Sequence, residues 1–241
     1  MKIPASKLVA HRGHQDQFPE NSLLAILDAI AAGATNIEFD LQLTKDKEVV
    51  LYHDIEMLRL SGVEKSIIDF NRDELTAFFV KEPKRLASRF TYNPIEFLDE
   101  LLPIIKKHPQ ITFFLEMKEE SLNAHGQDAC FQSLQKTLVS IPDNIVYISF
   151  DLSSVKRAKE EGFLKTALVF RDWDKRNHLL QEANADYGFI NYTRIPTKEA
   201  IVADKPIMVY EVRYPLIASQ LLERGAAAVE TFHIRALLSN S

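Results

Sequence analysis

The stretch that decides the fold is residues 36–54, Asn-Ile-Glu-Phe-Asp-Leu-Gln-Leu-Thr-Lys-Asp-Lys-Glu-Val-Val-Leu-Tyr-His-Asp. Its first half alternates apolar and polar residues, which predicts a strand over 36–43. Side chains alternate across a strand, so Glu38 and Asp40 share one face. A buried strand tolerates two such acids only beside a cation, because an unpaired buried carboxylate is costly. The alternative is a solvated strand face without a ligand.

The second half of this stretch returns the chain as a hairpin. The turn at 44–47 is too short for a crossover helix, so a strand over 48–53 must run antiparallel to 36–43. A turn centred on Lys45 and Asp46 pairs residues whose numbers sum to about 91, which places His53 opposite Glu38. A slip of one residue would make His53 an ordinary core histidine instead. A left-handed Lys47 in this turn would cost roughly 1–2 kcal/mol.

Outward from the hairpin, apolar strands alternate with amphipathic helices. Strands are predicted to begin near residues 8, 36, 111, 145, 165, 187, 207 and 227, and the predicted helices include short ones over 73–80 and 196–203. Eight such units are typical of a TIM (β/α)8 barrel. We therefore expect an α/β fold with a single domain over 1–241. The hairpin extends strand 2 of this barrel, and residues 54–92 form a small insertion.

Composition excludes several classes of protein. The chain has 241 residues, 46% of them hydrophobic, which is enough to bury a large core. The net charge of −5 and the lack of a basic tail argue against nucleic acid as a partner. No apolar run is long enough for a signal peptide or a membrane span, so we expect no integral membrane contact. Cys130 is the only cysteine, so a reducing cytoplasm is the expected compartment.

Chemically active side chains gather where neighbouring barrel strands end. Because catalytic groups of such barrels lie at the carboxyl ends of strands, these side chains should converge. Three carboxylates without cysteine suit Mg²⁺ or Ca²⁺, two cationic side chains would flank a bound phosphate, and two histidines can serve as acid and base. Metal-assisted cleavage of a phosphoester is the predicted chemistry. The residues concerned are His11, Arg12, Glu38, Asp40, His53, Glu116 and Lys118.

Other interpretations of single residues remain open. His11 and Arg12 could form an ordinary loop, and Lys118 could simply neutralise Glu116. Asn21 or Ser22 is expected to cap the helix that follows, and a cap is the favoured interpretation of Asn21. Glu20 could steady the loop that carries His11 and Arg12. Tyr210, Glu211 and Glu230 belong either to the core or to the rim of the pocket.

The chain resembles the glycerophosphodiester phosphodiesterases over roughly residues 8–171. The first 54 residues carry the most specific part of the likeness. The matching segments are His11-Arg12-Gly13, Pro19-Glu20-Asn21-Ser22, Gly33-Ala34, Ile37-Glu38-Phe39-Asp40, Thr44-Lys45-Asp46, Val50-Leu51-Tyr52-His53-Asp54, Arg59, Gly62, Asp73-Glu74-Leu75, Glu116-Met117-Lys118 and Ser149-Phe150.

The resemblance implies a TIM barrel and a role in lipid metabolism. It implies a divalent metal on Glu38, Asp40 and Glu116. It also implies that His11 and His53 are the acid–base pair, and that Arg12 and Lys118 hold the phosphate. In this family the glycerol 2-hydroxyl is thought to attack phosphorus and expel the alcohol, leaving a cyclic phosphate that water opens.

The C-terminal third departs from the family pattern. Residues 210–213 read Tyr-Glu-Val-Arg where the family has Trp-Thr-Val-Asn, and residues 230–233 read Glu-Thr-Phe-His where it has Thr-Asp-Tyr-Pro. The substrate therefore stays open between glycerophosphodiesters, lysophospholipid or sphingomyelin head groups, and a phosphate ester that is bound without turnover. The metal, the leaving alcohol and the oligomeric state are not determined by the sequence.

Overall fold

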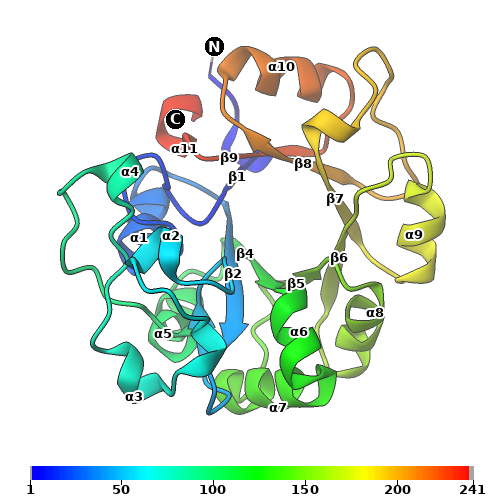
Figure 1. Cartoon of the computed structure of the whole chain (residues 1–241). Coiled ribbons are helices and arrows are strands. Elements are labelled where there is room, and N and C mark those ends of the chain that lie inside the picture. The colour runs from blue at the N-terminus through cyan, green and yellow to red at the C-terminus, as the bar shows by residue number, and fades with distance from the viewer. Residues whose placement is uncertain (1, 239–241) are drawn as a thin grey trace.

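The computed structural model of the protein describes residues 2–238, which form a closed barrel surrounded by helices (Figure 1). Eight parallel strands make the ring, because β1 pairs with β9 on one side and with β2 on the other. The predicted TIM barrel is therefore confirmed. Its strands are β1 (Leu8–Ala10), β2 (Asn36–Leu43), β4 (Thr112–Met117), β5 (Ile145–Ser149), β6 (Lys165–Val169), β7 (Tyr187–Asn191), β8 (Ile207–Val212) and β9 (Ala228–Thr231).

The strands separate two apolar layers. Outward side chains such as Ile37 and Phe39 of β2 pack against the surrounding helices, whereas Val9, Phe114 and Phe189 fill the inside of the ring. The surrounding helices are α1 (Leu23–Ala31), α5 (Leu98–Lys107), α6 (Glu119–His125), α7 (Gln127–Leu138), α8 (Leu152–Glu160), α9 (Arg176–Glu182), α10 (Pro215–Glu223) and α11 (Ile234–Leu237), with 3₁₀ turns η1 (Ala5–Lys7) and η3 (Tyr192–Arg194). None of the helices within residues 2–238 combines the length and the apolarity that crossing a bilayer requires.

The hairpin is confirmed, but its predicted register is wrong by one residue. Strand β3 (Val49–Leu51) pairs antiparallel with β2 outside the ring, with Leu41 opposite Leu51. Extrapolated along the strand, this register puts His53 opposite Phe39 rather than Glu38. The paired strand also ends at Leu51, so His53 lies beyond the ladder.

The turn explains the register. Thr44 and Glu48 close a three-residue loop, in which the Thr44 amide donates to the Glu48 carbonyl at 3.0 Å. Lys47 has a φ of 65°, the left-handed third residue that such loops require. The predicted turn has two residues between its paired strands, whereas this loop has three, and the extra residue moves every pair by one position.

The segment after the hairpin forms short helices over a small apolar cluster of its own. These are α2 (Leu58–Ser61), η2 (Ile67–Asp69), α3 (Arg72–Leu75) and α4 (Pro83–Leu86). The predicted helix over 73–80 is wrong beyond Leu75, because the Thr76 hydroxyl caps the Asp73 carbonyl and the Val80 amide donates to Asn93.

The predicted helix over 196–203 is also wrong. The guanidinium group of Arg224 donates hydrogen bonds to the carbonyls of Pro196 and Glu199. The guanidinium group of Arg176 donates to the carbonyl of Val202. These side-chain contacts hold the segment in place, and its backbone hydrogen bonds are limited to single turns such as the Glu199 amide donating to the Pro196 carbonyl.

Candidate active site

The predicted site residues meet at the carboxyl end of the ring. His11 and Arg12 follow β1, and Lys118 follows β4. On β2, Asp40 pairs in register with Glu116 of β4, so the two acids lie side by side. A cavity of about 270 Å³ opens at this end. Its lining includes His11, Arg12, His53, Glu116, Lys118 and Glu230.

The loop that carries His11 and Arg12 is fixed by close packing. Gly13 has a φ of 78°, and a Cβ there would lie 2.6 Å from the backbone of Ala25 in α1. Arg12 itself has a φ of 54°. Its amide donates to a carboxylate oxygen of Glu38 at 3.0 Å, so the loop is also tied to β2. These contacts argue against an ordinary loop.

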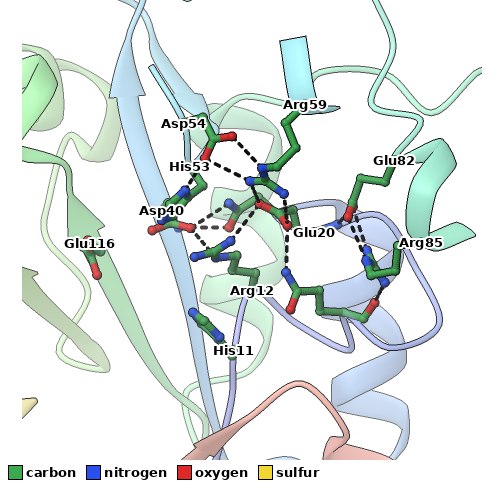
Figure 2. Close-up of polar contacts among 12 residues, drawn as sticks. His11, Arg12, Glu20, Asp40, His53, Asp54, Arg59, Glu82, Arg85 and Glu116 are labelled. Carbon is green, nitrogen blue, oxygen red and sulfur yellow. Dashed lines mark hydrogen bonds and ion pairs between the residues drawn. The ribbon is translucent and has the colours of Figure 1, made fainter. Parts of the chain in front are cut away.

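Arg12 lies between two buried carboxylates (Figure 2). Its Nε is 2.9 Å from Asp40 and its Nη1 is 2.8 Å from Glu20. Glu20 also accepts hydrogen bonds from both terminal nitrogens of Arg59, at 2.9 and 2.7 Å. Burial alone would raise the pKa of Glu20, but Arg12 and Arg59 lower it to about 2. Glu20 thus steadies the loop, as the sequence suggested, and Arg59 is an additional member of the network.

His53 is held from the side of the insertion. Its Nδ1 lies 2.5 Å from the Asp54 carboxylate, and Asp54 in turn accepts Nε of Arg59 at 2.6 Å. The Gln42 side chain donates to the His53 carbonyl at 3.0 Å. The contacts with Asp54 and Gln42, and not the pairing register of the hairpin, therefore position His53 at the cavity.

Asn21 has a different position from the predicted one. The helix cap is Ser22, whose hydroxyl accepts the Ala25 amide at 3.1 Å. Asn21 instead binds Asp40 twice, since its amide group donates to the Asp40 carboxylate at 2.9 Å and its oxygen accepts the Asp40 amide at 3.0 Å. The place of Asn21 in the Pro-Glu-Asn-Ser segment was the signal available for this role.

Lys118 connects the acids of β2 and β4. Its Nζ donates to Glu116 at 2.7 Å and lies 3.4 Å from Asp40. Burial opposes its charge, yet Glu116 and Asp40 raise the pKa of Lys118 above its usual value. The ammonium group is therefore fixed beside the cavity.

His11 is buried and lacks a polar partner at Nδ1. Its ring packs on Phe232 with 4.7 Å between centroids, and its Nε2 is 3.9 Å from Glu38. Burial and the neighbouring charge of Arg12 hold the pKa of His11 well below 6.5. Burial and Arg12 therefore favour the neutral form of this ring, in which one nitrogen has a lone pair.

Glu38 and Asp40, two residues apart on one strand, have opposite electrostatics. Burial would raise the pKa of Asp40, but Arg12, His53 and Lys118 hold it well below its usual range. Burial and the like charges of Asp40, Glu230 and Glu116 raise the pKa of Glu38 well above its usual value. The contrast arises because cationic side chains surround Asp40, whereas Glu38 is surrounded by other carboxylates.

The donor set fits a divalent cation. Donor atoms of Glu38, Asp40 and Glu116 lie within 4.8 Å of one another, and so do those of His11, Glu38 and Glu230. Buried carboxylate oxygens of Glu38 and Glu230 have no hydrogen-bond partner. Oxygen donors of this kind suit Mg²⁺ or Ca²⁺. Both acids of β2 are 1% exposed, which is inconsistent with a solvated strand face.

The far wall of the cavity is formed by the C-terminal strands. Tyr210 and Glu211 of β8 line it, together with Arg171 after β6. A second cavity of about 300 Å³ adjoins the first and shares Arg12 and Glu211 with it. Glu230, interpreted from the sequence as core or rim, lies in the wall of the first cavity.

The chain is similar to known proteins. Residues 11–231 match the glycerophosphoryl diester phosphodiesterase family. The protein YhdW of Bacillus subtilis is 32% identical over 198 residues, which cover 78% of this chain and 77% of YhdW. A glycerophosphodiester phosphodiesterase of Bacillus altitudinis is 29% identical over 155 residues, which cover 62% of this chain and 60% of that relative. The match thus spans less than two thirds of the second relative.

A solved structure supports the fold. It is a phosphodiesterase from Oleispira antarctica in complex with the product sn-glycerol-3-phosphate. It superposes with a TM-score of 0.78 at 20% identity, covering 96% of this chain and 94% of that one. At this identity the similarity is one of architecture.

Proposed function

The chain belongs to the glycerophosphoryl diester phosphodiesterase family, and we propose that it is a metal-dependent phosphodiesterase that hydrolyses glycerophosphodiesters to glycerol 3-phosphate and an alcohol. One observation carries this proposal: the barrel mouth brings together three carboxylates, two imidazoles and two fixed cationic groups. Glycerophosphocholine and glycerophosphoethanolamine are the expected substrates. We expect a small-molecule diester, and no nucleic acid, as the partner.

In this proposal Mg²⁺ or Ca²⁺ is held by Glu38, Asp40 and Glu116. Support comes from their all-oxygen donor set within 4.8 Å and from the unpartnered oxygen of Glu38. A bound cation would polarise the phosphoryl group and offset its developing negative charge.

Arg12 and Lys118 hold the phosphate in this proposal. Both are nearly buried, at 8% and 7% exposure, and both are fixed by carboxylates before any substrate arrives. Donors that are oriented in advance stabilise developing charge without further reorganisation. The contact of Lys118 with Glu116 does not exclude this role, because Nζ has three donor hydrogens.

His11 and His53 are proposed to transfer the protons. Neutral His11 accepts the proton of the glycerol 2-hydroxyl, whose oxygen attacks phosphorus. The bond from phosphorus to the alcohol oxygen breaks, and His53 donates a proton to that oxygen. Water then opens the cyclic phosphate with the two roles reversed, giving glycerol 3-phosphate. Asp54 supports this assignment, because its contact with Nδ1 fixes the ring of His53.

A second candidate keeps the site and changes the substrate. The wall formed by Tyr210 and Glu211, and the adjoining second cavity, motivate a phospholipase that acts on lysophospholipid or sphingomyelin head groups. A barrel that only binds phosphoesters is the third reading. Two imidazoles beside the same cavity argue against it, because binding alone does not need them.

A substrate panel separates these candidates. Purified protein would be incubated with glycerophosphocholine, glycerophosphoethanolamine, lysophosphatidylcholine and sphingomyelin, each with Mg²⁺, with Ca²⁺ or with EDTA. We expect cation-dependent turnover of the water-soluble diesters. Preference for the lipids would select the second candidate. No turnover of any compound by folded, metal-loaded protein would contradict enzymatic function.

We also propose a cytoplasmic location and a single folded domain over 1–241. The lone buried Cys130 and the absence of a spanning helix in the described part of the chain are consistent with this location. Cell fractionation tests the location. A single cooperative unfolding transition tests the domain assignment.

A further inference from the structure

Strand β9 places a fourth carboxylate inside the barrel mouth. Glu230 pairs in register with Val9 of β1 and lies on the same face as Ala228, which points into the ring. The Glu230 side chain is 3% exposed and lines the same cavity as His11 and Glu116. The Glu230 carboxylate therefore lies in the same cavity as the residues that are proposed to bind the cation and the substrate.

Glu230 has no cationic partner within residues 2–238. One of its oxygens is buried without any hydrogen-bond partner. The cationic side chains of the same cavity contact other groups. Arg12 binds Glu20 and Asp40, and Lys118 binds Glu116 and Asp40. Arg171 binds Glu119, and Arg194 donates to the Arg171 carbonyl. A buried ionised carboxylate left in this way is strongly unfavourable unless a cation or a proton neutralises it.

The charge balance of the site indicates what that ligand is. When ionised, Glu38, Asp40, Glu116 and Glu230 carry four negative charges, and Arg12 and Lys118 carry two positive ones. The pair of Glu20 and Arg59 is neutral as a unit, and Arg171, Arg194 and Glu211 line the cavity without being counted among the groups around the proposed ligands. The excess of two negative charges equals the charge of one divalent cation.

We propose that Glu230 is a fourth carboxylate ligand of the divalent cation and joins Glu38 in holding it. This inference rests on the proposed metal-dependent function. Glu38 supports it, because this residue offers a donor atom to both groups, one with Asp40 and Glu116 and one with His11 and Glu230, each within 4.8 Å. Four protein carboxylates favour Ca²⁺, which accepts many oxygen ligands, over Mg²⁺, which keeps several waters. Glu230 therefore makes the site selective for Ca²⁺.

Metal binding without substrate tests this inference on the full chain. Calorimetric titrations with Ca²⁺ and with Mg²⁺ would compare the wild-type protein with E230Q, an isosteric change. The matched control is E96Q, which removes a buried carboxylate outside the site, at the start of α1. E230Q should lose Ca²⁺ affinity by at least roughly tenfold, with a smaller loss for Mg²⁺, whereas E96Q should bind both ions like wild type.

Terbium luminescence gives a second readout that a merely structural role would not change. Decay times of bound Tb³⁺ in H₂O and D₂O count the waters on the ion. The E230A protein should hold about one more water than wild type, because a protein oxygen has been lost, whereas E230Q keeps one side-chain oxygen. Thermal unfolding checks that the variant folds. E230D provides a second variant, since it keeps the charge but withdraws the oxygens, and it should also lose Ca²⁺ affinity.

The results separate this inference from the proposed function. If E38Q abolishes Ca²⁺ binding while E230Q and E230D bind Ca²⁺ like wild type, Glu230 is not a ligand and the inference is overturned, although the metal-dependent function stands. If wild type binds neither ion, both are overturned.

Discussion

The two sides of the barrel mouth differ in how completely their charges are paired. On the side of β1, β2 and β4, Arg12, Asp40 and Lys118 each contact an oppositely charged group. On the side of β8 and β9, Glu230 is buried without such a partner, and Glu211 adopts a φ of 66°. The first side is therefore largely paired, with Glu38 as its exception, whereas Glu230 on the second side contacts no arginine or lysine of residues 2–238.

The two sides of the barrel mouth also differ in their likeness to the family. The paired side carries the family's motif, and its groups are oriented before substrate binds, which is what transition-state stabilisation requires. The unpaired side carries the residues that depart from the family. We infer that the first side determines the reaction and that the second adjusts the metal and the alcohol.

The largest effect is expected from the histidines of the paired side. H11A and H53A should each lower kcat by roughly 10²–10⁴-fold, the usual contribution of a general acid or base. Calcium affinity should change little, because the proposed ligands of the ion are the carboxylates of Glu38, Asp40, Glu116 and Glu230. The control is H178A, which alters an exposed histidine of α9. Steady-state assays with glycerophosphocholine measure this, and unchanged turnover in H11A and H53A would make the acid–base assignment wrong.

Substitution of Lys118 tests whether this side chain stabilises the phosphate or only neutralises Glu116 and Asp40. K118M should lower kcat/KM by about 10²–10³-fold if Lys118 stabilises the phosphate. Calcium affinity should rise in the same variant, because a positive charge beside Glu116 and Asp40 is lost. A variant with tighter Ca²⁺ binding and unchanged kcat/KM would show that Lys118 only neutralises its neighbours.

Glu20 measures how much the pairing stabilises the fold. E20Q leaves Arg12 and Arg59 without their shared partner and should cost on the order of 3 kcal/mol of unfolding free energy at pH 7. The pKa of Glu20 is lowered from 4.5 to about 2, so its contribution is complete above pH 4.5 and is lost as the pH falls towards 2. Urea unfolding of both proteins should therefore converge in that range. A constant difference down to pH 2 would contradict the assigned pKa.

The smallest effect is expected from substitution of Glu211, on the side of β8 and β9, and it concerns the preference among leaving alcohols. It lies between the two cavities, and E211A should change the preference among leaving alcohols by roughly tenfold or less. The kcat with the best substrate should change little. Competition between glycerophosphocholine and glycerophosphoethanolamine measures the preference. A large loss of kcat on both substrates would place Glu211 in the catalytic machinery instead.

Local patterns predicted the barrel and most of the site. The alternation of Ile37, Phe39 and Leu41 with acids fixed the faces of β2, and the β–α rhythm located all eight ring strands. Register depends on turn geometry, and the left-handed Lys47 shifted it by one residue. His53 still reaches the cavity, because Asp54 and Arg59 hold it there.

Contacts between distant segments explain what the sequence did not predict. Asn21 follows the rule for a helix cap, yet Asp40, distant in sequence, binds its side chain. The helix expected over 196–203 gives way to carbonyl contacts with Arg224. Glu230 was undecided between core and rim, since only the closed ring brings β9 beside β1 and β2.

Phosphorus NMR of glycerophosphocholine hydrolysis tests the central claim most directly. The proposed chemistry breaks the bond between phosphorus and the alcohol oxygen. Glycerol 3-phosphate should therefore accumulate, in equal amount with choline, when Mg²⁺ or Ca²⁺ is present, and none should form in EDTA. Phosphocholine as the product, or full turnover in EDTA, would contradict the claim that a divalent cation and the paired side of the barrel perform this reaction.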